Sequence, residues 1–430
     1  MRTAFSHVLP LLLATTTVAQ TPVFRAPEQV TDGPASYQLS RNPNGCLVMG
    51  SARTLDLVYW SGGETTSPTS PSYVLHRRWT PLTGWSAETS VADSFIGPDY
   101  IGGRQPSAAL GPDGTLWVAW HDHRHSTVGS PGNSNDNIEI YIDRLPVGGA
   151  FSSTDTRITN TSAGTLGDNG YLPRLAASNG GVLSVAWYDF SFNVTVSDLF
   201  LRRSDGSGTF PAIAGLSTFR LTDATTRSST PSYTVPDLAV DPTGANHIVW
   251  STGTGGPAPL LYAEVSGTIG AVTPVQLAAA TGGFFDPARI TTSDVGDVWV
   301  VYTNDPAGSS DIRAVRRRVG QATFDSPIAL VSGAALQNAP DLEVGFDGKL
   351  HAVWVDERDG RKVYYGRFTD SGALEYEVAI TGAGNWQRPT IQLDSEDAPF
   401  VAMELSGATS NLWFTYPQDA LAARDWELWR

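Results

Sequence analysis

A repeated unit of three short strands constrains the fold of this chain more than any other feature. Its clearest copy spans residues 339–367, APDLEVGFDGKLHAVWVDERDGRKVYYGR. The segment 341–344 alternates polar and apolar residues, and the turn 346–348 carries Asp-Gly, which tolerates a positive φ. The segments 350–354 and 363–368 are rich in residues that favour strands. A further turn and a fourth strand are expected after them.

The same order of strand and turn signals recurs along the chain. The copies begin at Ser36, Pro106, Pro173, Pro236, Pro287, Pro340 and Pro389. Their spacing of roughly 50 to 65 residues is typical of propeller blades. One such unit cannot bury both its faces, whereas units stacked around an axis can. We therefore expect an all-β chain with a single propeller of seven four-stranded blades. Six or eight blades, or an array of two-sheet sandwiches, are the alternatives.

The two ends of the chain carry their own signals. Residues 1–19 have a basic start, a short apolar core and a small-residue cleavage site, which together predict a signal peptide and a secreted or periplasmic protein. The propeller would then occupy residues 20–430. The segment 23–31 is expected to pair with the last blade, 389–430, although 426–430 could compete for that edge.

The charge balance limits the classes of partner. A net charge of -15 disfavours nucleic acids and anionic membrane surfaces, and also polyanionic ligands unless a local basic patch outweighs the mean. No later segment is apolar enough for a membrane span. The single cysteine, Cys46, lies in a probable strand and is expected to be a buried, inert thiol.

Candidate site residues gather at one end of the predicted ring. The start of the first strand and the end of the second strand of each blade share that end with the long loops, where sites usually lie. Aromatic and charged residues so placed suit a glycan or another extracellular ligand. The candidate ligand-binding residues are Trp60, Arg104, Tyr171, Arg174, Asp286, Trp386 and Arg388.

The run 121–125, His-Asp-His-Arg-His, is the most concentrated set of reactive side chains. In an extended segment its three histidines would point the same way, as a zinc site requires. A solvated loop and a ligand contact through His121 and His123 are the alternatives. The pair Asp122 and Arg124 recurs in another blade, where no histidine stands, and is therefore interpreted as a structural clamp of the loop.

Two catalytic arrangements are conceivable at the same end of the ring. Tyr188 occupies the place of His121 one blade later, and a histidine base with a tyrosine acid suits β-elimination on a uronic-acid polymer. Arg104 or Arg174 would then neutralise the sugar carboxylate. Glu404 with Asp286 would instead form a carboxylate pair for glycoside hydrolysis. Aromatic packing at Tyr188 and chance variation at Glu404 are the structural alternatives.

No cofactor motif is present in the sequence. Two Asp-rich loops, 134–137 and 356–359, are weak candidates for calcium, because neither has the ligand density of an established calcium loop.

The repeated pattern of Pro, Asp-Gly, V-x-W-x-D-x-R and I-Y-x-x-R resembles the sialidase-like (BNR-type) propellers of secreted bacterial proteins. The resemblance covers nearly the whole chain after residue 19 and implies the propeller fold. The sialidase catalytic set is not recognised, since the run 25–27, Arg-Ala-Pro, is only loosely similar to the family's Arg-Ile-Pro motif. A weaker resemblance, to propeller polysaccharide lyases, rests on His121, His123 and Tyr188.

These observations favour an exported propeller that binds an extracellular ligand, expected to be a glycan, through its loop-rich end. A carbohydrate-active enzyme, either a sialidase-like hydrolase or a polysaccharide lyase, is the first alternative. A scaffold for protein partners is the second.

Overall fold

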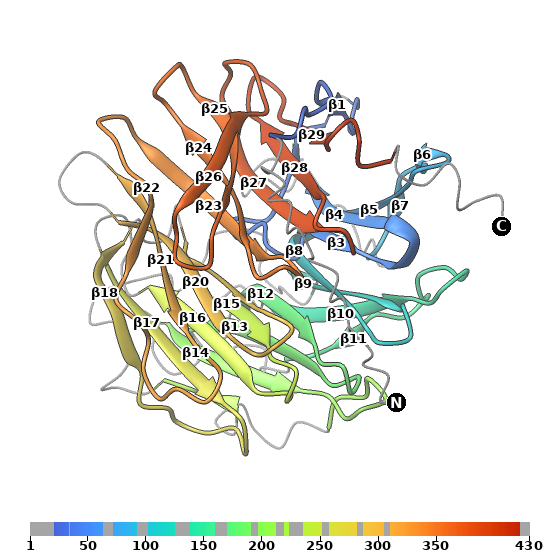
Figure 1. Cartoon of the computed structure of the whole chain (residues 1–430). Helices are drawn as coiled ribbons and strands as arrows, with labels where there is room; N and C mark the ends of the chain where they lie inside the picture. The colour runs from blue at the N-terminus through green and yellow to red at the C-terminus, as the bar shows by residue number, and fades with distance from the viewer. Residues whose placement is uncertain are drawn as a thin grey trace, which may run out of the picture.

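The chain forms seven small antiparallel sheets that follow one another around a ring (Figure 1). The structure, a computed structural model, describes residues 21–33, 35–62, 72–92, 102–124, 138–159, 170–190, 197–211, 219–222, 235–251, 258–281, 287–304 and 310–421. The prediction of an all-β, seven-bladed propeller is confirmed. The described residues contain the 3-10 turn η1 (Ser51–Arg53) and no helix long and apolar enough to cross a membrane.

The blades are numbered here in chain order. Blade 1 contains β2 (Tyr37–Gln38), β3 (Leu47–Met49), β4 (Leu55–Ser61), β5 (Tyr73–Thr80), β6 (Gly84–Trp85) and β7 (Thr89–Ser90). Blade 2 contains β8 (Gly103–Leu110), β9 (Leu116–Asp122), β10 (Glu139–Leu145) and β11 (Thr156–Arg157). Blade 3 contains β12 (Gly170–Ala177), β13 (Leu183–Asp189) and β14 (Asp198–Arg203). In the described part of blade 3, a single bridge between Phe200 and Arg220 marks the place of a fourth strand.

The remaining blades are regular four-stranded sheets. Blade 4 contains β15 (Asp237–Val240), β16 (Asn246–Ser251), β17 (Ala258–Val265) and β18 (Val275–Thr281). Blade 5 contains β19 (Arg289–Thr292), β20 (Val298–Asn304), β21 (Asp311–Arg317) and β22 (Ile328–Val331). Blade 6 contains β23 (Gln337–Val344), β24 (Leu350–Asp356), β25 (Lys362–Phe368) and β26 (Leu374–Ala379). Blade 7 contains β27 (Trp386–Leu393), β28 (Pro399–Leu405), β29 (Asn411–Thr415) and β1 (Glu28–Gln29).

The N-terminal segment closes the ring, as predicted. Strand β1 pairs antiparallel with β29, with Glu28 opposite Phe414, and a further bridge joins Phe24 to Pro417. In Figure 1 the blue β1 accordingly lies beside the red β29. The competing segment 426–430 lies outside the described residues. Strand β1 thus supplies the outer, fourth strand of blade 7.

Tryptophans of the second strands fill the spaces between blades. The largest fully buried side chains include Trp120, Trp187, Trp250 and Trp354, which occupy the same position in β9, β13, β16 and β24. Burying such a ring removes a large apolar surface from water and stabilises each interface between blades.

The predicted loop clamp is confirmed. Asp122 accepts hydrogen bonds from Trp120 Nε1 at 3.0 Å and from the Arg124 backbone N at 2.8 Å, and it pairs with the Arg124 guanidinium at 2.7 Å. Asp356 repeats this arrangement with the backbone and guanidinium of Arg358. The carboxylate thus ties the end of the second strand to the following loop.

The innermost strands share a bulge at the residue before their proline. Strands β8, β12, β23 and β27 each shift register there, and the residue before the proline takes a positive φ. The φ values are 54° at Gln105, 49° at Leu172, 50° at Ala339 and 47° at Arg388. A positive φ at residues other than glycine stores backbone strain, which tends to occur beside functional sites.

Blade 1 replaces that bulge with an eight-residue excursion, 39–46, between β2 and β3. We call this segment the plug. Asn42 Nδ2 donates to Pro236 O at 3.2 Å, and Asn44 Nδ2 donates to Asp237 Oδ2 at 3.0 Å, so the plug reaches blade 4. Gly45 O accepts from the Ala108 backbone N of blade 2 at 2.7 Å. The plug therefore crosses the centre of the ring.

Two residues of the plug show how closely it packs. Gly45 has a φ of 78°, and a Cβ there would lie only 3.0 Å from Ser107 Oγ and 3.1 Å from Arg174 Nη1. Cys46 is fully buried, its sulfur accepts from the Ser40 backbone N at 3.3 Å, and burial raises its pKa to about 11. The expectation of a buried thiol is confirmed, and the raised pKa keeps the thiol protonated and unreactive at neutral pH.

Candidate functional site

The register of the blades gathers the predicted site residues at one end of the ring. Arg104 lies opposite His121, Tyr171 lies opposite Tyr188, and Gln387 lies opposite Glu404 in the paired strands. Because the first strand of a blade begins where the second ends, these positions meet at the same end. We call this end the mouth; the short turns between first and second strands lie at the opposite end.

Aromatic and imidazole rings form a row across blades 2 and 3. The ring of His121 meets His123 edge-on at 5.8 Å and Tyr171 edge-on at 5.6 Å, measured between ring centres. Tyr171 stacks on Tyr188 at 5.3 Å with an angle of 17° between the planes, and Phe190 meets Tyr171 edge-on at 6.1 Å. His121 and Tyr188 are buried, whereas the other three rings are half-buried and face outward in part.

The environment of His121 keeps its imidazole neutral. The Leu172 backbone N donates to His121 Nδ1 at 3.4 Å, which leaves the proton on Nε2. Burial lowers the pKa of His121 well below its usual value, and the electrostatic influence of His123, Arg104 and Arg41 lowers it further. At neutral pH His121 is therefore an uncharged donor through Nε2.

Two arginines lie near His121 at the mouth. The Arg104 guanidinium lies 5.5 Å above the ring of Trp60, and its Nε donates to Ser72 Oγ at 3.2 Å. Arg41 belongs to the plug, and its backbone N donates to Gln105 Oε1 at 2.6 Å. Both are close enough to His121 to depress its pKa.

The blade 7 side of the mouth carries a neutralised pair. Arg388 Nη1 lies 2.9 Å from Glu404 Oε2, and Ser406 Oγ donates to Glu404 Oε1 at 3.0 Å. Glu404 is buried, so its charge balances Arg388 within the protein. The proposed carboxylate partner Asp286 and the third histidine, His125, lie outside the described residues.

Two other predicted ligand-binding residues, Arg174 and Trp386, make structural contacts within and between blades. Arg174 is buried below the mouth, where its Nε donates to Asp237 at 2.8 Å and its Nη1 to Ser107 at 3.0 Å, so that it ties blade 3 to both neighbours. Trp386 donates through Nε1 to Gly382 O at 2.8 Å and packs edge-on against Trp413 at 5.9 Å. Both side chains have structural partners that account for their burial.

The described residues contain no group of three His, Cys, Asp or Glu side chains placed to hold a metal ion. In the loop 356–359, Asp356 pairs with Arg358, and Asp359 accepts from Tyr364 Oη at 3.1 Å. The other Asp-rich loop, 134–137, lies outside the described part of the chain.

Sequence reasoning missed Arg41 and Phe190 at the mouth. Arg41 stands outside the repeat pattern, in the run 39–46 that interrupts the first strand of blade 1. That run, LSRNPNGC, is rich in turn residues, and this signal could have identified an insertion. Phe190 follows the second strand of blade 3, where the Asp-x-Arg pattern is absent. The repeat pattern therefore gave no expectation for the position of its side chain.

Comparison with known proteins shows a likeness of fold. No family model and no curated protein matches the sequence. A PL25 ulvan lyase solved with bound -[GlcA(1-4)Rha3S]- has a TM-score of 0.57 at 10% identity, over 90% of this chain and 94% of the lyase. The polysaccharide lyase Uly1 has a TM-score of 0.54 at 10% identity, over 87% and 90%.

A sialidase has the same architecture. The Trypanosoma rangeli sialidase in complex with 2,3-difluorosialic acid has a TM-score of 0.50 at 10% identity, over 89% of this chain and 54% of the sialidase. This chain therefore spans about half the length of that enzyme. The chain has the propeller fold found in sialidases and in PL25 ulvan lyase, at low sequence identity.

Proposed function

We propose that this chain is an exported propeller that binds a carboxylated glycan at the mouth. The observation that supports this most directly is the placement of Arg41 and Arg104 around the neutral imidazole of His121, beside the half-buried ring of Tyr171. Guanidinium groups pair with carboxylates through two hydrogen bonds at once, and aromatic rings receive the apolar face of a sugar. Export is supported by the signal-peptide pattern of residues 1–19.

The charge of the whole chain sharpens this proposal. A protein with a net charge of -15 repels an acidic polymer everywhere except where cations are concentrated. Binding at the mouth should therefore be local, and it should weaken as salt screens the arginines. The ulvan lyase structure holds a sugar that contains glucuronate, and its likeness of fold is consistent with an acidic glycan here.

A polysaccharide lyase is the second candidate, because the mouth combines the groups that β-elimination requires. A uronate lyase needs a cation on the carboxylate, a base for the C5 proton and an acid for the leaving oxygen. Arg104 would supply the cation and the half-buried His123 the base. Tyr171, which covers Tyr188, would supply the acid.

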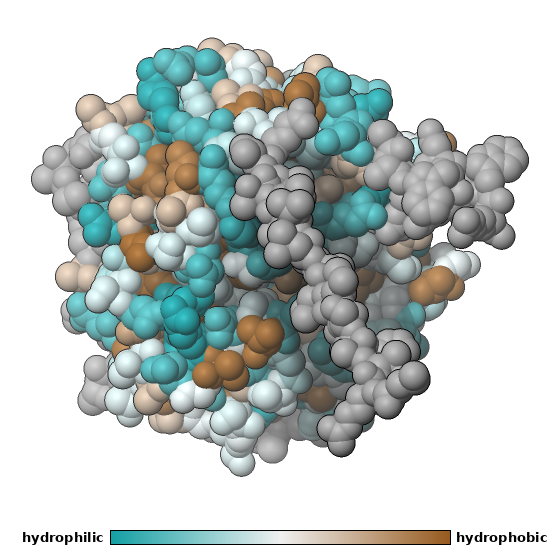
Figure 2. Space-filling model, viewed as in Figure 1, coloured by the Kyte–Doolittle hydropathy of each residue, from teal (hydrophilic) through white to brown (hydrophobic). Residues whose placement is uncertain are grey.

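The scaffold alternative receives less support. Hydrophobic residues on the described surface seen in Figure 2 stand in small groups among hydrophilic ones. The most exposed large ones are Leu82, Val147, Val295 and Phe346, which belong to turns of different blades. A protein partner would favour a larger continuous patch.

The deciding experiment is a glycan array with the purified mature chain, combined with assays for new reducing ends and for unsaturated uronates. Binding to carboxylated glycans without products supports the binding function. Unsaturated uronates that vanish in His123→Ala or Tyr171→Phe establish the lyase. Preference for neutral glycans, or binding to none, contradicts the proposal.

A further inference from the structure

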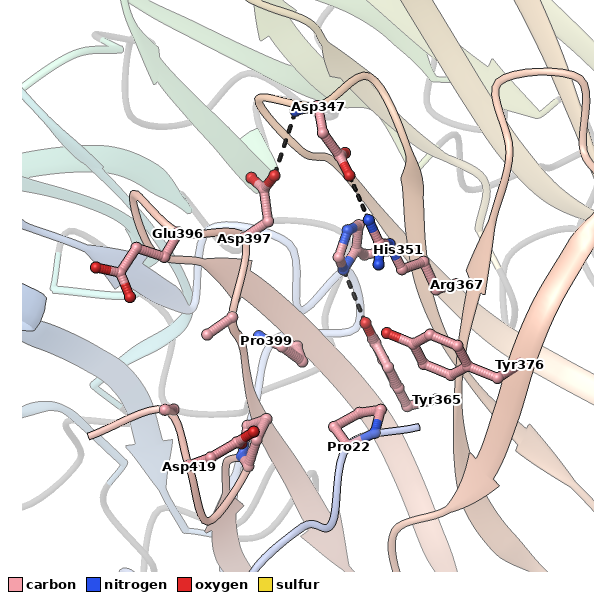
Figure 3. Close-up of a pocket in the computed structure, with 13 residues that line it drawn as sticks. Pro22, Asp347, His351, Tyr365, Arg367, Tyr376, Glu396, Asp397, Pro399 and Asp419 are labelled. Carbon is pink, nitrogen blue, oxygen red and sulfur yellow. Dashed lines mark hydrogen bonds and ion pairs between the residues drawn. The ribbon is translucent and has the colours of Figure 1, made fainter. Parts of the chain in front are cut away.

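A hollow of about 350 Å³ lies between blades 6 and 7, at the end of the ring opposite the mouth (Figure 3). Blade 6 contributes strand side chains and blade 7 contributes a turn and the segment after β29. The residues that matter for its chemistry are His351, Tyr365, Tyr376, Asp397, Pro399 and Pro417.

His351 is the group that marks this hollow as a site. Its Nδ1 lies 2.8 Å from Tyr365 Oη, and the side chain is only 2% exposed. Its Nε2 has no hydrogen-bond partner among the described residues. Burial lowers the pKa of His351 to about 4, the charge of Arg367 adds to this, and Asp347 opposes it. A neutral, buried ring nitrogen without a partner is costly, and a ligand in the hollow would satisfy it.

Blade 4 carries a matched pair whose outer nitrogen has a carboxylate within ion-pair distance, although it too makes no hydrogen bond of good geometry among the described residues. His247 Nδ1 lies 2.8 Å from Tyr262 Oη, and each histidine is the second residue of the second strand of its blade. His247 Nε2, however, lies 3.2 Å from Asp241 Oδ2. Asp241 begins the turn after the first strand of blade 4, and the equivalent residue of blade 6 is Gly345. Blade 6 therefore lacks the carboxylate.

Blade 5 also fills the space beside the blade 4 pair with a cation. The Arg317 guanidinium lies 5.4 Å from the ring centre of Tyr262, and its Nη2 lies 3.4 Å from His247 Nδ1. Glu264 pairs with the same guanidinium at 2.6 Å. The ring of Phe324 packs edge-on against Tyr262 at this interface, with 4.8 Å between the ring centres.

Blade 7 offers no such cation to blade 6. Arg317 lies opposite Val298, the first residue of β20. Extending the pairing of Val401 with Thr415 by two residues puts Pro417 opposite the first residue of β28. Pro417 thus stands where blade 5 has its arginine, and the space is the hollow.

The charges around the hollow favour a cation. Four carboxylates line it, and these are Asp347, Glu396, Asp397 and Asp419. Glu396 is already paired at 2.7 Å with Arg53, which does not line the hollow. The single lining arginine, Arg367, is already paired with Asp347 and, at 3.4 Å, with Glu375. Among the described residues, Asp397 accepts from the backbone N–H groups of Phe346 at 2.7 Å and Asp347 at 3.2 Å.

We propose that this hollow binds a small organic cation, a guanidinium or ammonium group that donates an N–H to His351 Nε2. Asp397 and Asp419 would balance its charge, and the tyrosine rings would face it as Tyr262 faces Arg317. With the imidazole proton on Nδ1 donated to Tyr365, Nε2 is free to accept. The ligand would lie against Tyr365 as Arg317 lies against Tyr262 between blades 4 and 5, but its N–H would reach Nε2 instead of the Nδ1 that Arg317 approaches. This site is independent of the glycan proposal.

Calorimetric titration of the full purified chain tests the site. The probes are argininamide for a guanidinium source and glucosamine for an ammonium source, and citrullinamide and N-acetylglucosamine are their neutral counterparts. We expect one equivalent of at least one cationic probe to bind, and its neutral counterpart to bind at least about tenfold more weakly. Equal binding of a neutral counterpart, or no binding of either cation, overturns the proposal.

Pro417→Arg is the decisive variant, because it supplies the arginine that blade 5 has. We expect it to fold, to retain binding at the mouth and to lose at least about tenfold in affinity for the cationic probe. Val295→Arg adds the same charge at an exposed turn of the same end and should bind the probe almost normally. Unchanged probe affinity in folded Pro417→Arg overturns the proposal. If Pro417→Arg does not fold, Asp419→Asn at the rim of the hollow should still weaken binding of the cationic probe. Unchanged probe affinity in Asp419→Asn would also overturn the proposal.

Discussion

The mouth and the hollow between blades 6 and 7 are both built on a buried neutral histidine beside tyrosines, yet opposite charges surround them. Arg41 and Arg104 lie near His121 at the mouth, whereas Asp397 and its neighbouring carboxylates lie near His351 in the hollow. The strands bury the imidazole in both cases and remove its charge. The residues at strand ends and turns then decide the sign of the ligand that each region favours.

A large expected effect concerns the acid stability set by His351. Its folded pKa of about 4 lies below the unfolded value, so the unfolded chain takes up a proton first as the pH falls. The stability from its neutral form is complete above about pH 6.5 and is lost towards pH 4, by about 3 kcal/mol. In His351→Gln, the free energy of unfolding should fall less between about pH 6.5 and about pH 4, because the titrating imidazole is gone.

Denaturant unfolding between pH 7 and pH 4.5, with His121→Gln for comparison, measures this difference. His121 also has a lowered pKa, so both variants should flatten the same limb of the profile. A wild-type profile that His351→Gln leaves unchanged would show that His351 titrates normally.

The second effect distinguishes the mouth from the hollow. Arg104→Ala should weaken binding of a carboxylated glycan by about 10- to 100-fold, because a hydrogen bond to a charged group is lost. Arg144 is a matched control, since its guanidinium also lies 5.5 Å above a tryptophan ring, that of Trp117, on an exposed surface. Arg144→Ala should bind normally, and binding of the cationic probe should be the same in both variants. If Arg104→Ala and Arg144→Ala lose glycan affinity equally, Arg104 does not belong to the glycan-binding site.

A smaller effect tests whether the blade 4 interface needs its cation. Arg317→Ala should cost about 1 kcal/mol, because its ion pair with Glu264 is partly exposed. Methylguanidinium at low concentration should restore part of the melting temperature, whereas methylurea should not. If neither compound raises the melting temperature of Arg317→Ala, the space beside Tyr262 has no preference for a cation.

A further effect lies on the inner ring, away from both regions. Burial, with the nearby Asp341 carboxylate, raises the pKa of Glu343 to about 8. The folded chain therefore holds a proton that the unfolded chain releases, and stability should fall as the pH rises from about 4.5 through 8. Glu343→Gln should flatten this alkaline limb, as thermal unfolding between pH 6 and pH 9 can show. A limb that persists in the variant would assign the loss to another group.

Sequence reasoning recovered the fold because each blade repeats its own local signals. Asp-Gly turns, alternating strands and the Asp-x-Arg clamp are short-range features, and Asp122 and Asp356 confirm them. Ring closure by the segment 23–31 was also predictable, since a strand without a blade must pair somewhere.

The sites were harder to predict, because they depend on neighbours that are distant in sequence. The hollow exists because Pro417 of blade 7 replaces the arginine that blade 5 supplies, a difference visible only once the interfaces are matched. The mouth depends on Arg41, which the plug delivers from outside the repeat. Arg174 was predicted as a ligand contact, whereas its buried pairing with Asp237 shows it tied into the ring.

The plug has a consequence for how the chain reaches its native state. Asn42 bonds to Pro236, a residue 194 positions away, and Arg25 bonds to Tyr416, 391 positions away. Contacts between such distant residues cost loop-closure entropy before they repay it, and they slow folding. Arg25 and Asn42 therefore receive these partners only when blades 4 and 7 have formed. The segments that carry them are expected to be fixed late in folding.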